Sequence, residues 1–188
     1  MKKVMKEIEV FTFDEVKDKA LDKNRYINVE DIDWWEDTID NWTGKLAEKG
    51  FEDADIHFSG FYSQGDGAVF DCKKFDIKKL LNLVEIPEED KKLILKADVE
   101  LEIYGKSLRY CHENTRHLDW VPSDYITDYN VNIIQKFVKK LEKVRIELCR
   151  EIYSDLKDEY EYLISDEQVE DTLKANEYEF LADGTIYC

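Results

Sequence analysis

The sequence Ser59-Gly60-Phe61-Tyr62-Ser63-Gln64-Gly65-Asp66-Gly67-Ala68-Val69-Phe70 holds three of the seven glycines of the chain. Residues 54–60, which lead into it, alternate between apolar and polar, and this pattern predicts a half-buried strand. The segment 64–67 then supplies a turn, because glycine reaches positive φ without steric cost and aspartate hydrogen-bonds to nearby backbone. The alternation resumes over residues 68–72. We therefore predict a β-hairpin with a glycine turn.

A second interpretation of the same turn is a loop whose bare backbone lies close to a binding partner. The polar groups of that loop are Ser63, Gln64 and Asp66. A phosphate-binding loop is excluded, because no Gly-Lys-Ser/Thr follows and a central aspartate repels phosphate.

The composition predicts a soluble protein with a single domain over residues 1–188. Hydrophobic residues make up 43% of the chain, which is enough for a sizeable core. No apolar run has the length of a membrane-spanning helix, and the N-terminus lacks the apolar segment of a signal peptide. The four cysteines show no CxxC spacing, so we expect reduced thiols and a cytoplasmic protein.

The charge balance is strongly acidic, with 44 acidic and 27 basic residues and a formal net charge of −17. Such a field opposes direct binding to DNA or RNA phosphates and favours association with basic protein surfaces. The alternative is that the charge only keeps the protein soluble.

The order of the predicted elements favours an α+β fold with a mostly antiparallel sheet, helices on one face, and one long C-terminal helix. Helices are predicted from Thr12 or Asp14 to Lys23, from Asn28 or Asp31 to Gly50, from Asp76 to Val84, from Pro87 through Ile94, over 128–163, and over 165–176. Besides the glycine hairpin, strands are predicted over 4–13 and 99–104, in a hairpin of 108–112 with 117–121, and in a terminal hairpin of 178–181 with 185–187.

Two segments carry a resemblance to a group of proteins. Residues 58–68 are similar to a Ser-Gly-Phe-x-Ser-Gln-Gly-Asp-Gly-Ala stretch that recurs in small phage and prophage proteins of unassigned function. The segments 152–156, 159–163, 165–167 and 175–180 are similar to the C-terminal stretch of those proteins, and Trp34-Trp35, Gly105, Tyr110 and His112 fit more loosely. The resemblance implies a phage or prophage origin and a host cytoplasm, and it brings no catalytic mechanism.

Two kinds of catalytic or metal chemistry are conceivable around the turn. His112 and His117, with Cys111 and Asp66, are possible zinc ligands, but their spacing matches no standard zinc motif. Ser63 or Ser59 with His112 and Asp66 has the residue types of a hydrolase, although no Gly-x-Ser-x-Gly precedes them. We predict no metal, no cofactor and no enzymatic activity. Tyr62, Tyr104, Tyr110 and Trp120 are interpreted as core residues rather than as the lining of a cleft.

The function favoured by these observations is that of a phage-encoded accessory protein that binds and inhibits a host protein. The expected target is a defence component with a basic, nucleic-acid-binding surface, as for an anti-CRISPR-like inhibitor. The alternatives are a small hydrolase with a site near Ser63–Asp66 and His112, and an antitoxin-like partner that neutralises a basic toxin. The candidate binding residues are Ser63, Gln64 and Asp66 in the turn and Asp155, Asp158, Glu159 and Glu161 on the long helix.

Overall fold

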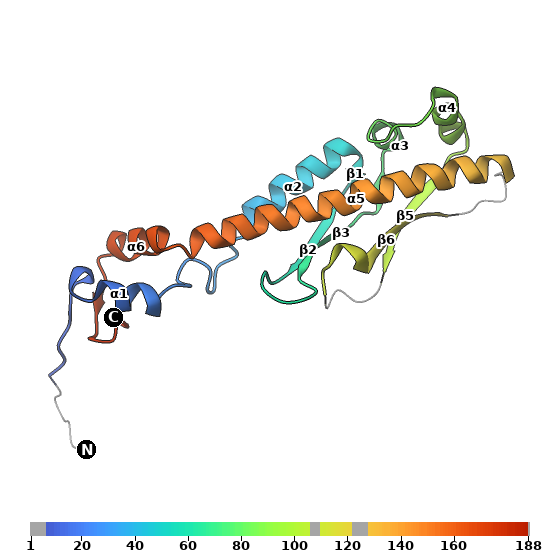
Figure 1. Cartoon of the computed structure of the whole chain (residues 1–188). Coiled ribbons are helices and arrows are strands. Elements are labelled where there is room, and N and C mark those ends of the chain that lie inside the picture. The colour runs from blue at the N-terminus through green and yellow to red at the C-terminus, as the bar shows by residue number, and fades with distance from the viewer. Residues whose placement is uncertain (1–6, 106–109, 122–127, 188) are drawn as a thin grey trace, which may run out of the picture. The chain divides into compact units, whose positions relative to one another are not determined.

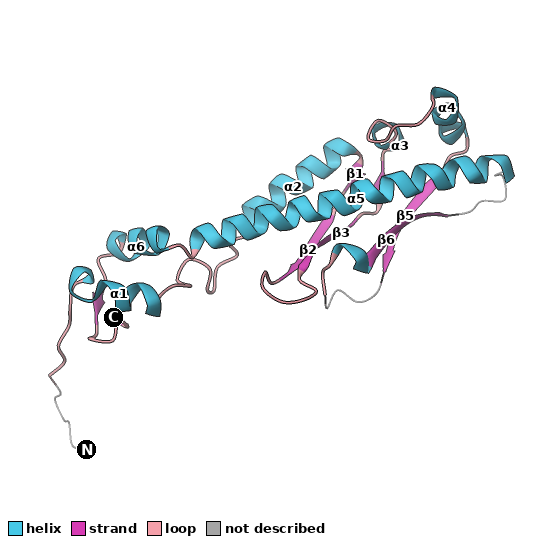
Figure 2. Cartoon of the chain, viewed as in Figure 1, coloured by secondary structure: helices cyan, strands magenta, loops and turns pink. Residues whose placement is uncertain are grey.

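The computed structural model describes residues 7–105, 110–121 and 128–187, and it confirms an α+β fold with antiparallel pairing and one long C-terminal helix (Figures 1 and 2). The helices are α1 (Phe13–Lys23), α2 (Glu36–Lys49), α3 (Ile77–Leu80), α4 (Glu88–Lys96), α5 (Asp128–Leu163) and α6 (Asp166–Ala175). The strands are β1 (Phe51–Glu52), β2 (Asp55–Ser59), β3 (Gly67–Asp71), β4 (Lys74–Phe75), β5 (Glu100–Gly105), β6 (Arg116–Val121), β7 (Glu179–Phe180) and β8 (Ile186–Tyr187). They form four two-stranded antiparallel sheets: β1 with β4, β2 with β3, β5 with β6, and β7 with β8.

The chain divides into two compact units. Unit 1 comprises Met1–Trp35 and Asp158–Cys188, and unit 2 comprises Glu36–Lys157. One boundary therefore falls inside α5, and the prediction of a single domain over residues 1–188 stays a prediction. Among the helices of the described residues, none combines the length and the apolar character that crossing a membrane requires.

Unit 1 brings α1 together with α6 and β7 around a small core. Phe13, Val16 and Ala20 of α1 pack with Leu173 of α6 and with Phe180 of β7. The sequence features that define these elements are local. Thr12 and Glu15 form a capping box at the start of α1, and Ser165 accepts the N–H of Gln168 at the start of α6. The predicted terminal hairpin is confirmed, with Gly184 at a φ of +85° in its turn.

The predicted glycine hairpin in unit 2 is confirmed. Strands β2 and β3 pair antiparallel, with Ile56 opposite Phe70 and Ser59 opposite Gly67. Val69 and Phe70 are both 0% exposed, so neighbouring residues of β3, which point to opposite faces, are both covered. Helix α5 covers one of these faces, and the thiol of Cys149 in α5 hydrogen-bonds to the backbone of Phe70.

The predicted hairpin of 108–112 with 117–121 is wrong where the structure describes it. The partner of β6 is β5, and the ladder runs from Glu100 opposite Val121 to Gly105 opposite Arg116. Tyr110 and the next two residues are therefore not a strand, and residues 108 and 109 lie outside the described part. After Cys111 and His112 the chain forms a short 3₁₀ turn, η1 (Glu113–Thr115), instead of a simple turn.

Two further boundaries differ from the prediction. In the predicted strand 4–13, residues 7–10 form no strand, and Phe11 alone makes a β-bridge, with Phe180. Helix α2 begins at Glu36 rather than at Asn28 or Asp31, because Asp31 adopts a left-handed φ of +59° that interrupts helical geometry. Within α2, Trp42 and Leu46 are buried.

Candidate functional site

The loop between β2 and β3 is closed by the side chain of Asp66. Its Oδ2 accepts the backbone N–H of Tyr62 at 3.0 Å and that of Ser63 at 2.7 Å. The N–H of Asp66 donates to the carbonyl of Ser63 at 3.2 Å, and Gly65 sits between them at a φ of +96°. Asp66 therefore fixes the loop conformation, and the side chains of Ser63 and Gln64 remain exposed.

The close backbone approach predicted at the glycines is made by another part of the same chain. A Cβ on Gly67 would lie 2.7 Å from the carbonyl oxygen of Cys111 and 2.9 Å from the Cα of His112. The N–H of Cys111 also donates to the hydroxyl of Ser59 at 3.3 Å. Gly67 thus serves internal packing, because only glycine leaves room for the segment that carries Tyr110.

Aromatic rings surround this loop. Phe61 stacks on Phe58 at 5.9 Å and lies 5.6 Å from the ring of Tyr153 in α5. Burial, followed by the nearby charge of Asp66, raises the pKa of the Tyr153 phenol. The residues Tyr62 and Tyr110 are 69% and 54% exposed. We call the set Phe61, Tyr62, Ser63, Gln64, Asp66, Tyr110 and Tyr153 the tyrosine loop surface.

The exposure of these rings corrects a sequence prediction. Tyr62, Tyr104 and Tyr110 were expected in the core, and all three are exposed, whereas Trp120 is half-buried. In the sequence, a tyrosine beside a glycine turn fits a core position and an exposed position equally well. The tertiary position of the loop decides between the two. Exposed aromatic rings on an ordered loop are typical of protein-binding surfaces.

The arrangement around His112 lends no support to a hydrolase. Asp66 binds its own loop, and Nδ1 of His112 lies 3.3 Å from the N–H of Asn114 and 3.1 Å from Glu113. In the described part of the chain, no hydrogen bond joins Ser59 or Ser63 to His112. Within the same residues, no group of three or more His, Cys, Asp or Glu side chains is placed to hold a metal ion.

A buried ion pair that the sequence did not reveal holds α5 against β6. Arg145 is 0% exposed and donates to both carboxylate oxygens of Glu142, at 2.6 and 2.9 Å. The same guanidinium donates to the carbonyls of Glu113 and Arg116 at 2.8 and 2.7 Å, while Glu142 accepts the N–H of Leu118 at 3.1 Å. The pair thus satisfies backbone groups of β6 and of the η1 turn that precedes it.

The four acidic residues predicted to bind a partner fall into different settings. Asp155 belongs to unit 2, where it accepts the indole N–H of Trp42 at 2.9 Å and lies 3.8 Å from the ammonium of Lys45. Its carboxylate therefore has an internal role. Asp158, Glu159 and Glu161 follow Asp155 on the same helix, α5; Asp158 and Glu161 are exposed and Glu159 is half-buried. The binding role predicted for these four residues stays a prediction.

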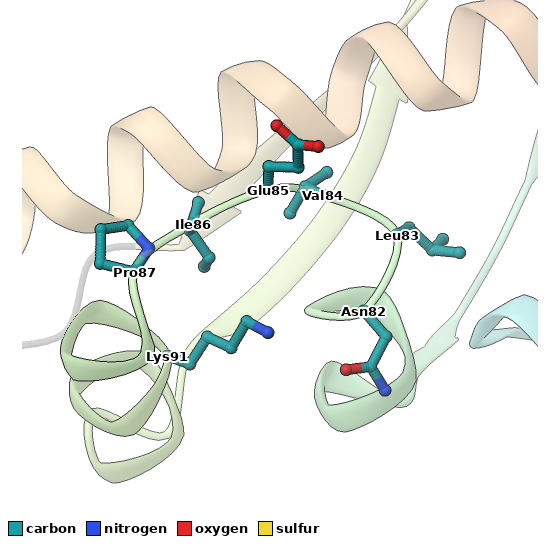
Figure 3. A pocket seen from close by; sticks show the side chains of 7 residues that line it. All are labelled: Asn82, Leu83, Val84, Glu85, Ile86, Pro87 and Lys91. Carbon is teal, nitrogen blue, oxygen red and sulfur yellow. The ribbon is translucent and has the colours of Figure 1, made fainter.

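A hollow of about 550 Å³ lies where residues 82–87 connect α3 to α4 (Figure 3). Lys91 points into it from α4, and its ammonium is 2.9 Å from the carboxylate of Glu88. A lysine from α5, Lys140, donates to the backbone carbonyl of Glu85. The hollow is a junction between connecting segments, and none of the predicted site residues lines it.

The chain belongs to the family described as a domain of unknown function, DUF8835, whose model matches residues 34–166. The matched range contains all of unit 2, including the tyrosine loop surface and the Arg145–Glu142 pair. Most of unit 1 lies outside it. No curated protein and no solved structure matches the chain.

Proposed function

We propose that this DUF8835 protein is a phage-encoded accessory protein that binds and inhibits a host protein, and that it makes the contact through the tyrosine loop surface. The observation that carries the proposal is an ordered loop with one exposed tyrosine and a second exposed tyrosine from a neighbouring segment. Asp66 holds this loop through two backbone hydrogen bonds, Tyr62 of the loop is exposed, and the exposed Tyr110 lies beside Gly65 from a different segment.

The physical basis is preorganisation. Tyrosine offers a large amphipathic contact area and has few rotatable bonds, so binding orders few degrees of freedom. The loop backbone is already fixed by Asp66, and Phe61 anchors the loop onto Tyr153. Little conformational entropy is then lost on association, which favours affinity from a small surface.

The charge of the chain supports the class of partner. At −17, the protein attracts basic surfaces, and nucleic-acid-binding proteins of a host defence system have such surfaces. Carboxylates placed where phosphates would otherwise lie compete with the nucleic acid, which is a direct route to inhibition. An antitoxin-like role uses the same contact with a toxin as the partner.

Affinity capture from host lysate tests the proposal. We expect a host protein to be retained at low salt and released as salt rises, because screening weakens steered association. Replacing both tyrosines, Tyr62→Ala with Tyr110→Ala, abolishes capture. The matched control is Tyr104→Ala, which removes a ring that is 48% exposed elsewhere in unit 2. Equal loss with the control would reject the tyrosine loop surface as the contact.

The acidic helix residues are tested separately. Asp158→Asn, Glu159→Gln and Glu161→Gln together remove three charges within unit 1. If they contribute to steering, association slows while the folded state persists. Unchanged capture and unchanged salt dependence would assign these residues to solubility alone.

A further inference from the structure

Unit 1 contains a groove that no predicted site includes. It has a volume of about 520 Å³. Two segments from opposite ends of the sequence line it: Val10, Phe11, Thr12, Phe13, Asp14 and Glu15 from the N-terminal side, and Leu173, Lys174, Glu177, Tyr178 and Glu179 from the C-terminal side. Both segments lie outside the range matched by the family model.

The walls of the groove are fixed before any partner arrives. Phe11 and Phe180 exchange two backbone hydrogen bonds, of 2.8 and 2.9 Å. Next to this bridge, the carboxylate of Glu15 accepts the N–H of Thr12 at 2.8 Å and its hydroxyl at 2.9 Å. These bonds hold the N-terminal segment against the end of α6 and β7.

The lining combines apolar side chains, which we call the floor, with acidic side chains. Val10 is 40% exposed, and the aromatic rings of Phe11 and Tyr178 are half-buried. Asp14, Glu177 and Glu179 are exposed carboxylates of the lining, in addition to Glu15.

The positive charge in the lining is already compensated. The ammonium of Lys174 lies 2.6 Å from the carboxylate of Glu170 and 5.3 Å from the centre of the Phe13 ring. The groove also sits in the more acidic part of the protein. Unit 1 has nineteen acidic and eight basic residues, a formal charge of −11 in 66 of the 188 residues.

We propose that this groove docks a basic segment of a partner protein, with lysine or arginine side chains against the carboxylates and an apolar side chain on the Val10 floor. The occupant follows from charge complementarity and from the apolar floor, which a purely ionic contact would leave unused. The proposal rests on the proposed function in that the occupant is a protein, but it assigns a different surface. The tyrosine loop surface and the groove each have their own test.

The probe is a synthetic eight-residue peptide with six lysines and two central leucines, titrated into the full chain at low salt. Calorimetry measures the affinity, and amide chemical shifts locate the contact. We expect shifts over residues 10–15 and 173–179. We expect the variant Asp14→Asn, Glu177→Gln, Glu179→Gln to bind at least tenfold more weakly.

The matched control is Asp22→Asn, Glu30→Gln, Asp33→Asn, which removes the same charge from exposed positions of unit 1 outside the groove. It should change the affinity by no more than about twofold, as screening at a distance predicts. A peptide of eight lysines tests the floor. Val10→Ser should weaken binding of the leucine peptide severalfold and leave the lysine peptide unaffected.

Three results would overturn the proposal: no binding of the leucine peptide, equal weakening by the groove and control variants, or shifts that map elsewhere. None of them bears on capture through Tyr62 and Tyr110. Conversely, the double tyrosine variant, which should lose lysate capture, should bind the leucine peptide as tightly as the unchanged protein does. Failure of one proposal is therefore distinguishable from failure of the other.

Discussion

Replacing Arg145 should be among the most destabilising single changes in unit 2. The guanidinium is 0% exposed, satisfies Glu142 with two hydrogen bonds, and donates to the carbonyls of Glu113 and Arg116. In Arg145→Met the apolar stem is retained, but a poorly exposed carboxylate and two carbonyls lose their donors. Removing one partner of a buried, hydrogen-bonded ion pair costs about 3 to 5 kcal/mol. Unfolding in urea, followed by circular dichroism, measures this loss.

The same helix provides a matched control. Arg150 pairs with Glu113 at 3.0 Å, but its side chain is 64% exposed. Arg150→Met should therefore cost no more than about 1 kcal/mol, as is usual for surface ion pairs. The double variant Arg145→Met with Glu142→Gln should recover part of the loss, because the unpaired charge is gone and the amide oxygen still accepts the N–H of Leu118. Equal costs for Arg145→Met and Arg150→Met would refute the role assigned to the buried pair.

Four other substitutions test separate parts of the structure. Gly67→Val should lower the free energy of unfolding by about 2 kcal/mol or more, because the new side chain clashes with the Cys111 backbone. Gly65→Ala should lower it by about 1 kcal/mol, because Gly65 has a positive φ. Unchanged melting midpoints would contradict both predictions. Glu177→Gly should stabilise the fold by about 1 kcal/mol, because Glu177 adopts a φ of +53° at the end of α6; a lower midpoint would oppose this reading. Burial raises the pKa of the Cys149 thiol from 9.0 to about 11. The neutral thiol therefore contributes stability that is complete below pH 9 and is lost as the pH rises through 11. In an alkaline titration of stability, Cys149→Ala should flatten that decline.

The elements that could be predicted from the sequence are those specified by local chemistry. The glycine hairpin, the start of α6 at Ser165 and the full extent of α5 depend on residues a few positions apart, and all three are confirmed. The predicted hairpin at 108–112 is wrong because β5 ends at Gly105 and is already the partner of β6. No local pattern reveals that competition.

The features that the sequence concealed depend on contacts between distant residues. Arg145 lies on an amphipathic helix where arginine is normally solvated, and its carbonyl partners are 29 and 32 residues away. The sequence predicts Ser63, Gln64 and Asp66 as binding residues of the turn, but their roles in the structure differ. Asp66 positions the loop, and the exposed contact area belongs to tyrosines expected in the core.

Photo-crosslinking from position 62 tests the central claim most directly. Tyr62 is replaced by p-benzoylphenylalanine, which preserves an aromatic ring at a position that is 69% exposed, and the protein is irradiated in host extract. The control carries the same group at Tyr104. Contact through the tyrosine loop surface predicts one discrete host protein crosslinked from position 62, suppressed by excess unlabelled protein and by high salt, and absent from position 104. Identical crosslinks from both positions, or none from position 62 while capture persists, would contradict it.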